Sequence, residues 1–161
     1  MPHFLVTVAP RELPAEGGAV HTLYLLAGPQ LSPADVARMA AELLHDPVVQ
    51  RASWREISAS SLAEDDLGAG AASIVEVAYR PGVTDNAGES AAEGARRLGV
   101  AGVGQARALS RHLLPAGVDP QARARELVID LVQTALVYRP GDSPQARLAF
   151  YTALVLSLIH I

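Results

Sequence analysis

The sequence predicts an α+β fold of tandem β-α-β-α-β repeats, with helices on one face of small sheets and the two repeats paired as an intrachain pseudo-dimer. Three observations predict it. Residues 75–79 alternate between two faces, as a half-buried strand does. Residues 36–44 and 124–132 each carry an apolar stripe at helical spacing. The second stripe repeats the first at an offset of 88 residues, and residues 21–26 align with 109–114 at the same offset.

Composition narrows the class of protein. The 161 residues are 50% hydrophobic, enough for the core of one domain or of two small ones. The absence of cysteine excludes a disulfide framework, a thiolate metal site and a cysteine nucleophile. A net charge of -4 without clustered arginines argues against a nucleic-acid or acidic-membrane surface. Nothing in the first residues indicates secretion, so we expect a cytoplasmic protein.

Residues 1–57 are interpreted as the first repeat. Strands are expected at 4–8 and 21–26, and Ser32 with Pro33 supplies an N-cap and first-turn proline for a helix. That helix carries the stripe Val36, Met39, Ala40, Leu43 and Leu44. A short strand at 48–51 closes the unit. Residues 9–18 contain two prolines and are too short for a further helix, so this repeat is predicted to lack its first helix.

Residues 58–73 are rich in Ser, Ala, Gly and acidic side chains, which predicts a solvated linker. The second repeat follows over 74–139. After the strand and the Pro81-Gly82 turn, capping residues at 84–86, with capping-box spacing from Asn86 to Glu89, predict a helix that runs to Gly99. A strand near 109–114, a helix starting at Asp119-Pro120 and a strand at 136–139 complete the unit. The second helical stripe is Ala124, Leu127, Val128, Leu131 and Val132.

The C-terminal residues differ in character. Residues 140–155 are interpreted as an exit linker and the start of a next segment. The last six residues, 156–161, are the translation of CTG TCT CTT ATA CAC ATC, the end of a transposon used to prepare DNA for sequencing. We therefore expect 156–161 to be a sequencing-adapter artefact and the chain to be a fragment of a longer protein.

Candidates for chemistry are few. The five histidines lack the spacing of a helical metal site. The glycines of 99–104 follow a helix and precede a strand, the reverse of a phosphate loop, and indicate a helix cap and a turn. The acidic run at 64–66 is interpreted as a solvated patch. Ser110 and His112 share one strand face but have no third orienting group, so no nucleophile pair is predicted.

Arg80 and Asp85 flank the turn between the strand at 74–79 and its helix. An arginine at a strand end beside a capped helix can contact a substrate phosphate or a neighbouring domain. The alternative is a surface arginine and an ordinary N-cap, and both interpretations stay open. No catalytic, cofactor-binding or metal-binding residue is predicted in the chain.

The stretch Val-Glu-Val-Ala-Tyr-Arg-Pro-Gly-Val-Thr-Asp-Asn-Ala-Gly at 75–88 resembles the opening of the small-subunit-like domain of phosphoribosylformylglycinamidine synthase. The resemblance is good over about 73–139 and weaker over 20–54. The chain is similar to the tandem form of this domain, which is fused to the front of single-chain synthases. It implies an α+β fold and a place in purine biosynthesis. The intact ligase converts formylglycinamide ribonucleotide to the amidine with ATP, Mg and glutamine-derived ammonia.

This resemblance implies that the chain is an N-terminal fragment with an assembly role, docked to the synthetase and glutaminase domains of the same enzyme. The ATP-binding parts lie outside the 161 residues, so the fragment itself is expected to be inactive and to hold no cofactor. Two alternatives remain. One is a stand-alone duplicated α+β regulatory module that binds a small molecule between its copies, and the other is a separate structural subunit of the synthase.

Overall fold

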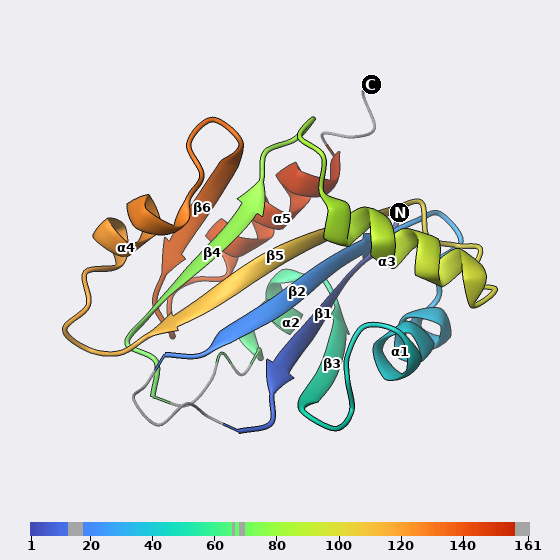
Figure 1. The fold of residues 1–161 in the computed structure, drawn as a ribbon, viewed down its shortest axis with the longest axis horizontal. Coiled ribbons are helices and arrows are strands. Elements are labelled where there is room, and N and C mark those ends of the chain that lie inside the picture. Colours follow the sequence, from blue (N-terminus) through green and yellow to red (C-terminus); the bar gives the residue numbers. More distant parts are fainter. Residues whose placement is uncertain (13–17, 66, 68–69, 157–161) are drawn as a thin grey trace.

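A computed structural model describes residues 1–12, 18–65, 67 and 70–156. The described part forms one six-stranded antiparallel sheet and five helices (Figure 1). The strand order across the sheet is β3-β1-β2-β5-β4-β6, so β2 and β5 lie at the centre. The strands are β1 (His3–Pro10), β2 (Val20–Ala27), β3 (Gln50–Glu56), β4 (Ser73–Tyr79), β5 (Gln105–Leu114) and β6 (Gln133–Tyr138).

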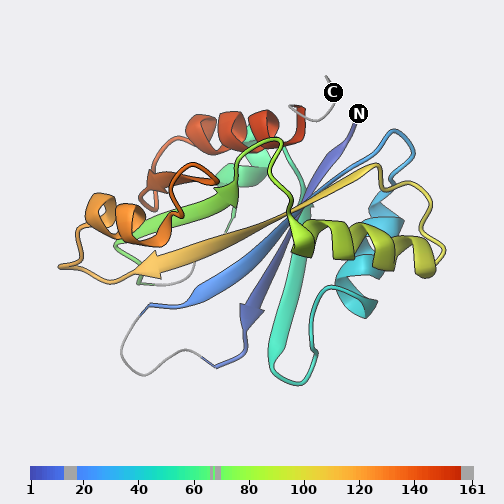
Figure 2. The same cartoon turned by 45° about the horizontal axis from the view of Figure 1, so that its top comes forward.

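The helices lie on both faces of this sheet. We call the face that carries α1 (Pro33–Glu42), α3 (Asn86–Arg97) and α4 (Pro120–Leu127) the front face. The back face carries α2 (Ala59–Ala63) and α5 (Gln145–Leu156). Figure 2 shows α5 on the side of the sheet opposite α3. The helices expected from the sequence, α1, α3 and α4, do lie on one face. The sheet, however, is a single continuous one, and α2 and α5 cover its other face.

Because successive side chains of a strand point to opposite faces of the sheet, each hydrophobic cluster lies on one face. On the front face, Phe4, Val6 and Val8 of β1 pack against Val36 and Met39 of α1, together with Ala91 and Ala95 of α3. A second front cluster joins α4 to β4 and β6. On the back face, Leu5, Leu23, Leu25 and Ala27 pack against Leu62 of α2 and against Tyr151, Leu154 and Val155 of α5. The core is largely aliphatic, as its composition predicts.

Two segments expected to be linkers belong to this packed structure. Within 58–73, Ser58 caps α2, and Leu62 of that helix is 2% exposed. Within 140–155, α5 buries Tyr151 completely. Both expectations are wrong for these parts. Alanine-rich and serine-rich composition looks solvated in sequence, but an isolated apolar residue on a short helix is enough to dock it on a sheet. Leu156 is the last residue of α5, and residues 157–161 lie outside the described part.

Three local expectations also need correction. Strand β4 is buried on both faces rather than one. The strand expected at 48–51 runs over 50–56 instead, and Val48 and Val49 lie in the preceding turn with exposed side chains. The helix α4 ends at Leu127, and Leu131, placed in its stripe, is 82% exposed with a φ of 69°. The other stripe is confirmed, since Val36, Met39, Ala40 and Leu44 are buried.

The turn from β4 into α3 has the predicted order of parts. The N-cap is Asp85, whose side chain accepts a hydrogen bond from the Gly88 amide, so the expected capping box at Asn86 is wrong. The helix ends before Gly99, which has a φ of +82°, and the amide of Val100 donates to the carbonyl of Ala95. This confirms that the glycines after α3 form a helix cap and a turn. In the described part of the chain, no helix has the length and apolar character needed to cross a membrane.

Candidate functional site

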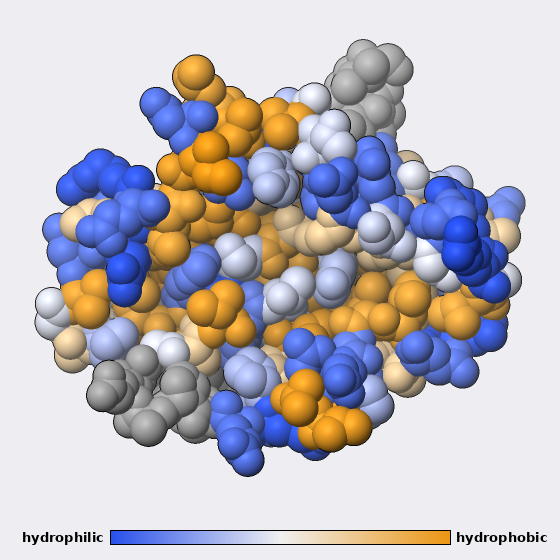
Figure 3. Space-filling model, viewed as in Figure 1, coloured by the Kyte–Doolittle hydropathy of each residue, from blue (hydrophilic) through white to orange (hydrophobic). Residues whose placement is uncertain are grey.

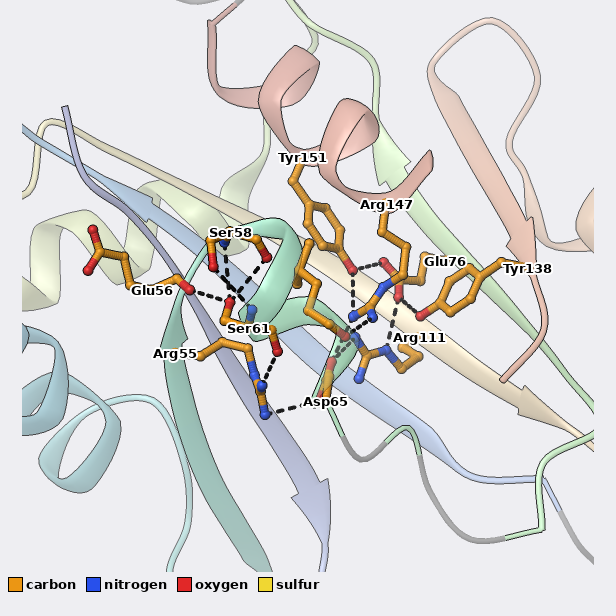
Figure 4. Close-up of polar contacts among 11 residues, drawn as sticks. Arg55, Glu56, Ser58, Ser61, Asp65, Glu76, Arg111, Tyr138, Arg147 and Tyr151 are labelled. Atoms are coloured by element: carbon orange, nitrogen blue, oxygen red, sulfur yellow. Dashed lines mark hydrogen bonds and ion pairs between the residues drawn. The ribbon is translucent and has the colours of Figure 1, made fainter. Parts of the chain in front are cut away.

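The most unusual feature of the molecule is a cluster of charged and phenolic side chains buried on the back face (Figure 4). Strands, a loop and a helix all contribute to it. Its members are Arg55 from β3, Asp65 after α2, Glu76 from β4, Arg111 from β5, Tyr138 from β6, and Arg147 and Tyr151 from α5. We call these seven residues the ionic cluster.

At the centre, Glu76 and Arg111 form an ion pair between adjacent strands. They are register partners of β4 and β5. The Nε of Arg111 donates to Oε2 of Glu76 at 2.9 Å, and both side chains are 0% exposed. In sequence, Glu76 is simply the polar position of an alternating strand. In the structure its face is covered by α5, so the carboxylate has to be neutralised inside the protein.

Asp65 forms ion pairs with three arginines. Its Oδ2 accepts from Arg111 Nη2 at 3.2 Å and from Arg147 Nη2 at 2.7 Å, and its Oδ1 lies 3.4 Å from Arg55 Nη2. The Asp65 side chain is 6% exposed. The expectation that residues 64–66 form a solvated acidic patch is therefore wrong for Asp65, and Asp66 lies outside the described residues. Arg147 Nη1 also donates to the carbonyl of Leu62 at 3.1 Å, which ties α5 to α2.

Two tyrosines complete the shell around Glu76. Tyr151 donates to Oε1 at 2.5 Å, and Tyr138 donates to Oε2. The guanidinium carbon of Arg147 lies 5.1 Å from the centre of the Tyr138 ring, within range of a cation–π interaction. Glu76 thus accepts hydrogen bonds from β5, β6 and α5 together, so one carboxylate holds three elements in place.

The electrostatics leave little scope for acid–base chemistry. Burial raises the pKa of both Tyr138 and Tyr151, and the nearby Glu76 raises the two values further, so both hydroxyls stay protonated donors. Burial alone raises the pKa of Asp65, but Arg111, Arg147 and Arg55 outweigh it and lower the pKa below its usual value. Burial lowers the pKa of Arg111, but Glu76 outweighs it, and the pKa lies well above the usual value. Near neutral pH the two tyrosines are therefore neutral, Asp65 is negatively charged and Arg111 is positively charged.

A surface pocket of about 470 Å³ opens beside the ionic cluster. One wall consists of Asp65, Tyr138 and Arg147, and the other is the loop 139–144 between β6 and α5. Most polar atoms of the cluster are engaged by one another, but Nε of Arg147 and Nη1 of Arg111 are buried without a hydrogen-bond partner in the described part of the chain.

The two residues singled out from sequence are placed apart from this cluster. Arg80 has an exposed side chain, and its amide donates to the carbonyl of Val132 at 2.8 Å. Asp85 is 6% exposed, and its two oxygens accept from the amides of Gly88 and Ala108, each at 2.8 Å. Asp85 therefore joins the start of α3 to β5. Among the described residues, no ion pair joins Arg80 to Asp85.

Of the other candidates, His45 and the Ser110–His112 pair can be placed, whereas His160 lies outside the described residues. In the described ranges, no group of three or more His, Cys, Asp or Glu side chains could hold a metal ion. His45 lies just beyond α1, with Nδ1 2.6 Å from the carbonyl of Ala40. Ser110 Oγ lies 2.9 Å from His112 Nε2 on the front face of β5. Burial lowers the pKa of His112, and Arg123 lowers it further. No hydrogen bond orients the second ring nitrogen within the described part, so the pair lacks the third group of a triad.

Sequence reasoning missed every member of the ionic cluster. The one available signal was Glu76, an acidic residue between Val75 and Val77 in a strand whose other positions are apolar. Its partners come from positions 35 to 75 residues away, which a local pattern does not connect.

The chain was also compared with known proteins. No family model matches it. No curated protein matches it.

Proposed function

We propose that the chain is the N-terminal small-subunit-like region of a single-chain phosphoribosylformylglycinamidine synthase. The observation that carries the proposal is the motif at 75–88, together with the place it takes in the fold. Its strand part is β4, a buried strand between β5 and β6, and its turn and capping residue lead into α3. The resemblance therefore includes a buried strand of the sheet and is not confined to a surface loop.

We propose further that the two halves of the sheet are tandem repeats paired as an intrachain pseudo-dimer. The strand order supports it: β3-β1-β2 is followed by β5-β4-β6, the same order reversed. In the central pair, His21 lies opposite Arg111 and Leu23 opposite Leu109. Adding 88 to 21 gives 109, and adding 88 to 23 gives 111, so the register is symmetric about the pair Thr22–Ser110.

The turns before the two edge strands support the same duplication. The amide of Asp46 donates to Oε1 of Gln50, and the Gln50 amide donates to the Asp46 carbonyl. The amide of Ile129 likewise donates to Oε1 of Gln133, and the Gln133 amide donates to the Ile129 carbonyl. These turns correspond at an offset of 83 residues, since 50 plus 83 is 133, and not 88 as the sequence alignment of the edge strands assumed.

The role we propose for this region is assembly. The buried ion pairs Glu76–Arg111 and Asp65–Arg147, which join strands and a loop to one another and to α5, favour a structural task. The two related turns also expose apolar side chains, with Val48 79% and Leu131 82% exposed. Figure 3 shows apolar surface at two opposite rims, over the α1–β3 turn and the α4–β6 turn. Exposed apolar groups at equivalent positions suit contacts with neighbouring domains.

In the intact enzyme, the synthetase and glutaminase parts would carry the ATP- and Mg-dependent transfer of glutamine-derived ammonia, in the cytoplasm. This region would hold the synthetase and glutaminase parts in fixed relative positions and present the Arg80 side chain toward them. The alternatives are a separate structural subunit of the same synthase, and a duplicated module that binds a small molecule on its own.

Co-purification tests the assembly role. Residues 1–156 are produced together with the synthetase part encoded downstream in the same gene, and the mixture is separated by size-exclusion chromatography. We expect the two polypeptides to elute together in equal amounts, and Arg80→Ala to weaken the complex while Arg125→Ala does not. Separate elution of two folded polypeptides would contradict the proposal and favour the stand-alone module.

A further inference from the structure

Arg107 is a buried arginine that belongs to no ion pair among the described residues. It lies in β5 with its side chain on the back face, opposite Leu25 of β2. The residue is only 4% exposed. Its Nε and Nη2 are both closed off from solvent and have no hydrogen-bond partner in the described part of the chain. Arg107 therefore differs from Arg111 and Arg147, whose guanidinium groups reach carboxylates.

The two unpartnered atoms are a matched pair. The N–H bonds of Nε and Nη2 point in the same direction along one edge of the planar guanidinium, and together they form the fork that binds two oxygens of a carboxylate. The nearest acidic group is Asp85, whose oxygens already accept from two backbone amides. Burial lowers the pKa of Arg107, and Asp85 only partly opposes this.

Further unpartnered polar atoms lie beside the fork. Gln105 is two residues before Arg107 and is the register partner of Ala27, which is in turn the partner of His3 on β1. All four side chains share the back face, because the strands are in register. Oε1 of Gln105 and Nε2 of His3 are buried without a partner among the described residues. Ala27, whose side chain is a methyl group, lies between His3 and Gln105 in the register of the sheet.

Burying these polar atoms without hydrogen-bond partners is energetically unfavourable. A buried polar group without a hydrogen bond destabilises a protein, and an unpaired buried charge does so more strongly. The large majority of buried side-chain polar atoms in proteins have a partner, so the two unpartnered donors on one guanidinium call for an acceptor. The missing partner must accept two hydrogen bonds from Arg107 and carry negative charge.

We propose that Arg107 binds the carboxylate of a small organic acid at this end of the back face, with His3 and Gln105 beside it. The carboxylate oxygens accept from Nε and Nη2 of Arg107, and the charge of the ligand compensates the buried guanidinium. Leu154 and Val155 in the last turn of α5 pack in the same cluster as Leu25 and Ala27. The site is separate from the proposed docking role and does not depend on it.

A titration with sodium formate tests the site directly. The Nε–H signals of the arginines are followed by ¹⁵N NMR in residues 1–156, with sodium chloride at equal ionic strength as the reference. We expect the Arg107 signal to move and saturate while the signals of the exposed arginines stay in place. Uniform small movements of all arginine signals would overturn the proposal, because they indicate only ionic strength.

Thermal unfolding provides a second readout. At a formate concentration roughly ten times the Kd, we expect the melting temperature to rise by about 3–6 °C over the chloride reference. Arg107→Met and Arg107→Lys should both abolish this rise, the second because lysine keeps the charge but lacks the fork. The exposed control Arg125→Met should retain it. An equal rise in the melting temperature of the native chain and of Arg107→Met, or no rise in either, would overturn the proposal. It would mean that water hydrogen-bonds to Nε and Nη2 of Arg107.

Discussion

Glu76 and Arg111 form a fully buried ion pair between two neighbouring strands, with 2.9 Å between Oε2 and Nε. Because Glu76 also accepts from Tyr138 and Tyr151, this pair fixes β6 and α5 relative to the central sheet. A buried pair of this kind contributes little net stability over an apolar pair, but it is expensive to break. We infer that its role is to specify where α5 docks, because any other placement of the helix would leave the buried Glu76 without the Tyr151 hydrogen bond.

Glu76→Gln should destabilise the protein by about 3–5 kcal/mol, because it leaves the buried guanidinium of Arg111 without its central counter-charge. Urea unfolding followed by circular dichroism measures the change. The matched control is Glu126→Gln, an exposed member of an i,i+3 pair on α4, which should change stability by at most about 0.5 kcal/mol. Equal effects of the two variants would show that the buried pair does not hold the fold together.

Deletion of residues 145–161 should abolish cooperative unfolding. It removes Tyr151, Leu154 and Val155 from the back-face core and exposes the Glu76–Arg111 pair. Differential scanning calorimetry checks this, with deletion of 157–161 alone as the control that should still unfold in one sharp transition. A sharp transition in the longer deletion would mean that α5 is an accessory rather than part of the domain.

Asp65 should make the protein sensitive to acid. Its pKa is lower in the folded chain than its usual value of 3.8, so the stability it contributes is present at neutral pH. That contribution is lost progressively as the pH falls below about 5 and through the lowered pKa. Asp65→Asn should therefore be about 3 kcal/mol less stable than the native chain at pH 7, with the gap closing toward pH 3. Urea midpoints at several pH values test this, and a gap that does not depend on pH would contradict it.

Asp85→Ala should cost about 2–3 kcal/mol, because it removes both the N-cap of α3 and the acceptor for the Ala108 amide. The natural comparison is Asp119→Ala, since Asp119 caps α4 at the surface through a single bond to the Gln121 amide. That control should lose only about 1 kcal/mol. Guanidinium unfolding gives both values. Similar losses of unfolding free energy in the two variants would mean that the hydrogen bond from the Ala108 amide to Asp85 contributes nothing to stability.

Val48→Ser combined with Leu131→Ser should leave stability nearly unchanged, because both side chains are exposed at turn tips. The same double variant should weaken co-elution with the synthetase part if these turns are the docking contacts. Ser60→Ala with Ser90→Ala, also at the surface, serves as the control for size-exclusion chromatography. Unimpaired co-elution of the double variant would place docking elsewhere on the molecule.

Local patterns in the sequence predict much of the sheet. The alternation at β4, the Ser32-Pro33 and Asp119-Pro120 helix starts and the turn after α3 all appear where capping and periodicity place them. These features depend on neighbours within a few residues. The end of α4 was misjudged because an apolar stripe at 131 and 132 continues the helical period, whereas the chain turns at Leu131 to begin β6.

Local sequence patterns could not predict the ionic cluster, and the reason is physical. Asp65 sits in a stretch whose composition is typical of solvated loops, and its burial depends on arginines at 55, 111 and 147 that converge only when the sheet forms. Likewise, α5 was taken for a linker because the polar residues at its start hide the apolar face formed by Tyr151, Leu154 and Val155. Long-range charge compensation is a property of the fold and not of the local sequence.

The most direct test of the synthase assignment is to read the source DNA across the codons for residues 154–161 and beyond. We predict that the reading frame continues after residue 155 with a sequence different from 156–161, and that it leads into a synthetase domain. A genuine Leu-Ser-Leu-Ile-His-Ile end followed directly by a stop codon would contradict the assignment to a single-chain synthase.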